Sequence, residues 1–372
     1  MKWLTFDLRT GRKLRYLPTK TGGKWTSKLN SAGSLSCTVP FSRATPALNL
    51  WESTREWRTG LAAVDGDVVL QAGPIVPPRD WTGRSITLQA DGIAGILDQR
   101  AIIPAPLAAM EIAGPIDEDD PDWTITFSGS YSDVIRGMIL NAMAVDGGEL
   151  PVVLPEVTGG THVLPYKGFD FASVWQRIHE LTQRMDGPQV RFDPRFNEDR
   201  DGIEFVLRVG SEAEPYLGGS KMHRWSQSAA KSPISNLQGS SVDDTRVRQG
   251  SLGWSVGGRQ SEATVVVKRR DSWLTDRGWP LMDVIDRDHL NATETSTLDS
   301  YLAARLERSR RTSDVFMFDV QRDTARTARV GDNVDMPVKD HPILPDGPYR
   351  LRITSMSGSD SDQIHVEAVQ RG

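Results

Sequence analysis

The chain has 372 residues, of which 38% are hydrophobic and 25% charged, an ordinary globular balance that leaves room for about two to four domains. Its formal net charge of −5 argues against a dedicated nucleic-acid binder, because such a protein needs a basic surface to neutralise phosphates. The single cysteine, Cys37, excludes an intrachain disulfide and a cysteine-rich metal site.

We expect neither a secretion signal nor a membrane span from the sequence. The N-terminal segment Met1–Asp7 carries an acidic residue where a signal peptide needs an apolar run. No stretch approaches the ~18 consecutive apolar residues of a membrane span. We therefore expect synthesis and folding in the cytoplasm, or assembly from there into something larger.

Strands and tight turns are predicted at the start of the chain. Leu61–Val64 and Val68–Leu70 flank Asp65-Gly66-Asp67. Asp-Gly between apolar runs indicates a hairpin, because type I′ turns need positive φ. The Gly73-Pro74 pair is predicted to end the second strand.

One further strand and a short helix are predicted after this hairpin. Ser85–Ala90 alternates as a strand, and Gly92–Leu97 suggests a short helix. We interpret residues 1–105 as a small antiparallel barrel or sandwich.

The composition changes in residues 106–122, which are interrupted by prolines and carry the acidic run Asp117–Asp120. The run lacks the alternating carboxylates of a calcium loop. We therefore predict that residues 106–122 form a linker.

Two amphipathic helices are predicted in residues 123–202, which we interpret as an α+β unit. Ser130 can cap a helix whose apolar stripe runs from Tyr131 to Ala142. Asp170 can cap a second helix with a stripe from Phe171 to Met185.

The remainder of the chain is predicted to be rich in strands. Ile203–Val209 alternates cleanly, and Thr264–Lys268 contains three consecutive valines, which favour a strand. A third helix is predicted from Thr297 to Arg310. The last predicted strands are Val315–Val320, Tyr349–Ser355 and Ile364–Val369.

No pattern of catalytic residues stands out. Of the six histidines, His179 is followed by Glu180, but Gln183 occupies the position at which a zinc protease needs a second histidine. Neither a nucleophile elbow nor a phosphate-binding glycine loop is present. A carboxylate pair of a glycosidase stays possible, since 49 acidic residues leave many combinations open. We expect no enzyme, no catalytic, metal or cofactor-binding residues and no cofactor.

Two features allow either a structural or an interface role. The basic run Arg305–Arg311 ends the third predicted helix, where a solvated turn is favoured over a docking or nucleic-acid patch. Tryptophan is frequent both in cores and at interface hot spots. The eleven tryptophans are Trp3, Trp25, Trp51, Trp57, Trp81, Trp123, Trp175, Trp225, Trp254, Trp273 and Trp279.

Three residue groups carry a resemblance to a known family. They are the hairpin Leu61–Ile75, the strand Ile86–Gly92 leading through a short helix into Leu97–Arg100, and the turn Val330–Val334 before the closing strands Tyr349–Val369. With this order of elements the chain resembles the distal tail hub, or tail-associated minor tail, proteins of long-tailed bacteriophages, particularly those of actinobacteria.

The resemblance implies a fold of the α+β class, predominantly β, with two tail-tube-like antiparallel β-barrels and peripheral α+β domains. Residues 1–105 would be the first barrel. Strands from 203–262 together with 312–372 would form the second barrel, and 123–202 and 263–311 would be peripheral. Since no lysozyme or peptidase module follows the last predicted strand, we expect cell-wall digestion to belong to other subunits.

The resemblance further implies a homotrimeric ring at the virion tail tip. The ring would adapt the sixfold tail tube to a threefold tip and would surround a channel that DNA crosses without specific binding, during host attachment and genome ejection. Its partners would be the distal tail ring, tail tube, tape measure and tip or fibre proteins. The alternatives are a β-rich carbohydrate-binding or glycan-hydrolysing protein and a hub of a bacterial secretion or contraction apparatus.

Overall fold

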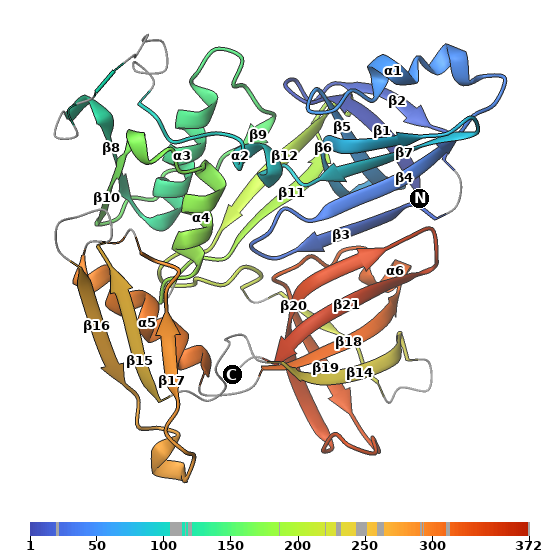
Figure 1. Cartoon of the computed structure of the whole chain (residues 1–372). Helices are drawn as coiled ribbons and strands as arrows, with labels where there is room; N and C mark the ends of the chain where they lie inside the picture. The colour runs from blue at the N-terminus through green and yellow to red at the C-terminus, as the bar shows by residue number, and fades with distance from the viewer. Residues whose placement is uncertain are drawn as a thin grey trace.

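The chain forms two units dominated by strands and two smaller α+β units (Figure 1). The computed structural model describes residues 1–19, 22–104, 114–115, 117, 121–185, 187–219, 221–227, 232–242, 251–258, 264–290, 292, 294–309 and 313–370. Most of the predicted linker 106–122 lies outside the described residues. The predicted class, predominantly β with large antiparallel sheets, is confirmed.

The N-terminal β unit is drawn in blue in Figure 1. Its elements are β1 (Lys2–Asp7), β2 (Lys13–Leu17), β3 (Lys24–Lys28), β4 (Ser34–Pro40), α1 (Leu50–Ser53), β5 (Thr59–Asp65), β6 (Val68–Trp81), β7 (Ser85–Asp91) and α2 (Ala94–Leu97). Its strands lie in the order β3-β4-β7-β6-β5-β1-β2, and every neighbouring pair is antiparallel.

The C-terminal β unit is drawn mainly in red in Figure 1. Its elements are β13 (Met222–Arg224), β14 (Ile234–Val242), β18 (Ser313–Gln321), α6 (Arg322–Ala325), β19 (Asn333–Val338), β20 (Gly347–Gly358) and β21 (Gln363–Gln370). Its strands lie in the order β14-β18-β21-β20, and β19 pairs with both β20 and β13.

The two β units repeat the same succession of elements. In chain order, β3-β4-α1-β5-β6-β7 corresponds to β14-β18-α6-β19-β20-β21, and each neighbouring strand pair of the first series has its counterpart in the second. The register corresponds as well, through three buried cross-strand pairs in each unit. They are Leu35–Ala90, Cys37–Leu88 and Val39–Ile86 in the first unit, and Phe316–Ala368, Phe318–Val366 and Val320–Ile364 in the second.

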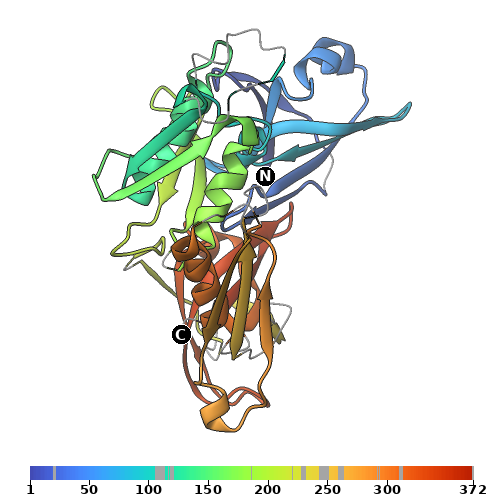
Figure 2. The same cartoon turned by 60° about the vertical axis from the view of Figure 1, so that its left-hand side comes forward.

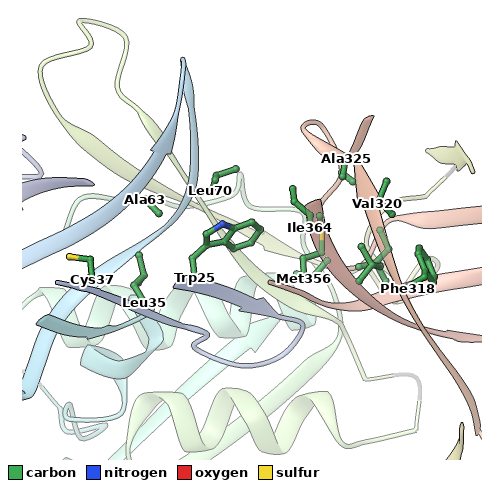
Figure 3. Packing of buried hydrophobic residues seen from close by; sticks show 14 of the residues in the cluster. Trp25, Leu35, Cys37, Ala63, Leu70, Phe318, Val320, Ala325, Met356 and Ile364 are labelled. Carbon is green, nitrogen blue, oxygen red and sulfur yellow. The ribbon is translucent and has the colours of Figure 1, made fainter. Parts of the chain in front are cut away.

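A direct strand pair joins the two units. The segment Trp25–Lys28 of β3 pairs antiparallel with Ser355–Gly358 of β20, so one sheet runs from β14 to β2. A single hydrophobic core spans this joint, and Figure 3 shows Trp25 and Leu70 of the first unit beside Met356 and Ile364 of the second. The two units therefore share one sheet and one hydrophobic core. The described pairs form an open path, so closure of each unit into a barrel stays a prediction.

The first α+β unit is drawn in green. It comprises β8 (Thr124–Gly129), α3 (Tyr131–Met143), β9 (Val152–Val153), β10 (His162–Lys167), α4 (Val174–Thr182), β11 (Val190–Phe196) and β12 (Ile203–Val209). Its two small sheets are β10-β8 and β11-β12-β9, and α3 and α4 bury their apolar stripes in a core of their own. The predicted Ser130 cap is confirmed as a capping box with Asp133.

The cap predicted for the second helix is wrong. Ser173, not Asp170, caps α4 by accepting a hydrogen bond from the backbone N–H of Gln176. Phe171 adopts a positive φ of 48° and is 64% exposed, so the helix cannot extend back to it. Asp170 instead forms an ion pair with Arg177, at 3.1 Å.

The second α+β unit, in orange, packs one helix on a small sheet. It comprises β15 (Leu252–Gly257), β16 (Val265–Arg270), β17 (Asp283–Asp286) and α5 (Thr295–Ser309), with strand order β16-β15-β17. A Cβ on Gly253 would lie 2.6 Å from Cδ1 of Leu302, so the absent side chain lets α5 approach the sheet closely.

Two sequence-based expectations about the strands differ from the structure. Of the stretch 203–262, β13 and β14 join the C-terminal β unit, but β12 pairs with β11 and β9, and β15 pairs with β16 and β17. Alternation identifies a strand without identifying its partner. Gly73-Pro74 does not end a strand either, because β6 passes there from its partner β5 to its partner β7 and continues to Trp81.

A buried carboxylate ties the first α+β unit to the C-terminal β unit. Asp332, whose side chain is 3% exposed, accepts hydrogen bonds from Lys221 Nζ at 2.8 Å, His223 Nε2 at 2.9 Å and the Arg329 backbone N–H at 3.0 Å. Arg191 of β11 lies 3.8 Å from it. Burial by itself would raise the pKa of Asp332, but the hydrogen bonds from His223 and Lys221 outweigh it and hold the pKa below its usual range.

Candidate assembly surface

The histidines occupy separate places in the fold. His162 stacks on Tyr131 at 4.1 Å, and His289 stacks on Tyr301 at 3.6 Å. His223 binds Asp332 as described above, and His365 lies 3.0 Å from Asp319. Each side chain has a partner within its own neighbourhood, and the structure brings no two of these histidines together at one site.

Two histidines directly follow an aspartate in the sequence, His289 after Asp288 and His341 after Asp340, and each makes its hydrogen bonds to other groups. His289 Nδ1 lies 2.8 Å from Asp286 Oδ2 rather than binding its neighbour Asp288. His341 Nδ1 accepts hydrogen bonds from the backbone N–H groups of Ile343 and Leu344. Both histidines therefore organise local backbone and side chains.

Two small cavities lie among the described residues. Each encloses about 10 Å³, the space of a single water molecule. Among the described residues no group of histidine, cysteine, aspartate and glutamate side chains is arranged to hold a metal ion. None of the helices described is both long and apolar enough to cross a membrane.

The predicted basic run contributes to contacts within the chain. Arg305 forms ion pairs with Asp286 at 3.1 Å and Asp288 at 3.0 Å. Arg308 donates to the side-chain and backbone oxygens of Gln183, both at 3.0 Å, and so holds α5 against the end of α4. Arg308 is exposed, as expected of a solvated turn, and Arg305 is partly buried. Arg310 and Arg311 lie outside the described residues.

Several exposed aromatic side chains belong to the N-terminal β unit. Trp81 is 69% exposed, Trp51 61%, Tyr16 50% and Trp57 42%. Single exposed apolar residues are normal, but several large aromatics on one unit are typical of an interaction surface. The sequence alone did not distinguish these exposed tryptophans from buried ones such as Trp3 and Trp25.

The segment that carries Trp51 and Trp57 is held in place by contacts with β6. Arg79 lies over the Trp51 ring, 4.6 Å from its centroid, and donates to the backbone oxygens of Trp51 and Thr54. Glu56 forms an ion pair with the same guanidinium at 3.1 Å. The Trp57 backbone N–H donates to Ile75 O at 2.8 Å, which fixes the segment after α1 to β6. Such prior ordering lowers the entropy lost when a partner binds.

Trp81 lies on the hairpin formed by β6 and β7. The second half of β6, Val76–Trp81, pairs with β7 and is here called the β6 arm. In Figure 2 this light-blue and teal hairpin projects beyond the rest of the chain. Every residue of the arm is partly or fully exposed. The arm is therefore suited to contact a neighbour.

Sequence comparison identifies no relative of this chain. No protein-family model matches the sequence, and no curated protein matches it significantly.

Comparison of folds finds phage tail proteins. A tail protein from Neisseria meningitidis MC58 is 14% identical with a TM-score of 0.56, over 100% of this chain and 98% of that one. The 43 kDa tail protein of prophage MuSo2 from Shewanella oneidensis is 11% identical with a TM-score of 0.57, over 100% and 98%. A prophage tail protein from Listeria monocytogenes EGD-e is 11% identical with a TM-score of 0.51, over 100% and 95%. The chain therefore shares its fold, along its whole length, with phage tail proteins, as the resemblance implied.

Proposed function

We propose that this chain is the structural hub of a bacteriophage tail tip, in which three copies form a ring around the DNA channel. The observation that carries the proposal is the repeated β unit. One chain holds two units of the same strand succession, locked by the β3–β20 pair. Three chains then present six units to a sixfold tail tube and threefold symmetry to the tip.

The fold comparisons support this proposal independently. The similar structures are tail proteins, and they match the α+β units as well as the β units, because the alignment covers the whole chain. A rigid pair of β units suits a subunit that bears load during host attachment and genome ejection. The net charge of −5 suits a ring past which DNA moves without being held.

The proposed role works through interfaces rather than through chemistry. The partners are other copies of the chain and neighbouring tail subunits, namely the distal tail ring, tail tube, tape measure and tip or fibre proteins. The working place is the virion tail tip, after synthesis and assembly in the host cytoplasm. The α+β units, at the periphery of the ring, are free to meet these neighbours.

The location is tested by labelling particles. A phage carrying an epitope tag on the chain, viewed by electron microscopy with gold-labelled antibody, is expected to bind gold at the distal tail end only. A phage with the tag on its capsid protein provides the matched control. Gold on the capsid, or tagged particles without any gold, would reject the tail-tip hub, and a tag recovered in a secretion apparatus would favour the related hub of that system.

A further inference from the structure

The contact between the two β units within one chain shows how unit meets unit. At the β3–β20 pair, Trp25 lies opposite Gly358. A Cβ on Gly358 would lie 2.9 Å from Nε1 of Trp25, so the indole covers the glycine closely. A large side chain on one strand thus fits an absent side chain on the other.

The repeat identifies the counterpart of the β3 side of this contact. β14 corresponds to β3, because each is the first strand of the repeat and pairs with the second, β18 or β4. Trp25 pairs with Leu35, and Gly239 pairs with Phe316, which corresponds to Leu35. The counterpart of Trp25 is therefore Gly239.

The counterpart of the β20 side follows in the same way. Gly358 pairs with Ile364 of β21, and Trp81 pairs with Ile86 of β7. Ile86 and Ile364 correspond, because they face Val39 and Val320 respectively. The counterpart of Gly358 is therefore Trp81, at the end of the β6 arm.

Both counterparts lie on free strand edges in the described chain. β14 pairs with β18 only, and the β6 arm pairs with β7 only. Trp81 is 69% exposed, and a Cβ built on Gly239 would meet nothing within 4 Å. The first unit–unit contact is made within the chain, while the two edges for a second contact stand open.

We propose that β14 of one copy pairs antiparallel with the β6 arm of a second copy, with Gly239 opposite Trp81. The size match is that of the intrachain contact with the sides exchanged, because the tryptophan now lies on the arm and the glycine on the edge strand. This inference rests on the proposed ring. The contact joins different surfaces of identical chains, and such a head-to-tail contact closes into a ring when its rotation fits.

The β6 arm also limits where a strand can add. Pro77 and Pro78 lack backbone N–H groups and so cannot donate to an added strand. After the prolines the arm keeps its backbone N–H groups at Arg79, Asp80 and Trp81, and in the proposed register Asp80 and Trp81 lie beside Ser240 and Gly239. The prolines also discourage indiscriminate edge-to-edge pairing of the free arm.

Disulfide trapping tests the register directly. Residues opposite one another on antiparallel strands have Cβ atoms about 4.5–5.5 Å apart, near the reach of a disulfide. A chain carrying both Trp81→Cys and Gly239→Cys is expected to give covalent dimers and trimers on mild oxidation, resolved on a non-reducing gel. Either substitution alone is expected to give neither product, and Asp80→Cys with Ser240→Cys provides a second pair should the first misfold.

Two control pairs define the outcomes. Thr26→Cys with Ser357→Cys reports the same pairing inside one chain and is expected to cross-link without forming oligomers. Trp81→Cys with Ser235→Cys is displaced by four residues, about 13 Å along a strand, and is expected not to cross-link. Native mass spectrometry is run in parallel. A trimer in which neither proposed pair cross-links overturns this interface and leaves the hub standing, whereas a stable monomer overturns both.

Discussion

Replacing Trp25 tests whether the β3–β20 joint holds the two β units together. Trp25 is 4% exposed and packs in the core shared by both units. A buried tryptophan removes about 150–250 Å² from water, about 4–6 kcal/mol at about 25 cal/mol per Å². Measured truncations of large core side chains to alanine cost about 3–5 kcal/mol. We expect Trp25→Ala to lower the free energy of unfolding by about 4 kcal/mol.

The assay is urea unfolding followed by far-UV circular dichroism, on protein dilute enough to be monomeric. With a slope of about 3 kcal/mol per molar urea, the midpoint of Trp25→Ala should fall by about 1.3 M. Trp81→Ala is the matched control, since Trp81 is 69% exposed and its replacement should change stability by less than about 0.5 kcal/mol. Equal midpoints for the two variants would refute the role given to the joint.

Three further predictions concern single sites. Asp332→Asn should cost about 3 kcal/mol in urea unfolding, because a neutral amide accepts weaker hydrogen bonds from Lys221 and His223 than the carboxylate does and buries an N–H donor without a partner. Since folding lowers the pKa of Asp332, the wild-type advantage should be present above about pH 4 and vanish as the pH falls through the folded-state pKa. Ser130→Ala removes the capping box of α3 and should cost about 1 kcal/mol by the same assay, with Ser128→Ala unchanged. Burial raises the pKa of the Cys37 thiol to about 12, so an aromatic disulfide reagent should react with it only after unfolding, and rapid labelling of the native protein would contradict the packing of β4.

Local patterns predicted much of the secondary structure. The Asp-Gly turn, the apolar stripe after Ser130 and the alternation in Ser85–Ala90 each gave the right element, because each depends on neighbouring residues alone. The second helix was harder. Asp170 and Ser173 are both good caps before one stripe, and only the positive φ of Phe171 decides between them.

Strand partners depend on contacts between distant residues and could not be read from the sequence. Ile203–Val209 alternates as well as any strand of the C-terminal β unit, yet it pairs with β11 and β9. The repeat of the β units is hidden for a related reason. Corresponding positions share burial and register but not residue type, as Leu35 and Phe316 illustrate.

The candidate surface shows the same limit. Trp25 and Trp81 are indistinguishable as letters in the sequence, but one is 4% and the other 69% exposed. Their difference comes from the tertiary fold, in which β3 already has a partner unit and the β6 arm does not. The expectation that function lies in interfaces needed the structure before it could name residues.

The mass of the native assembly tests the central claim most directly. The purified chain, measured by native mass spectrometry over a range of concentrations, is expected to give a species of three times the mass of one chain. Class averages of that species by electron microscopy should show a ring with six similar lobes around a channel. A chain that stays monomeric at the highest concentration, or assembles with twofold symmetry, would contradict the hub, and a monomer that binds glycans would favour the carbohydrate-binding alternative.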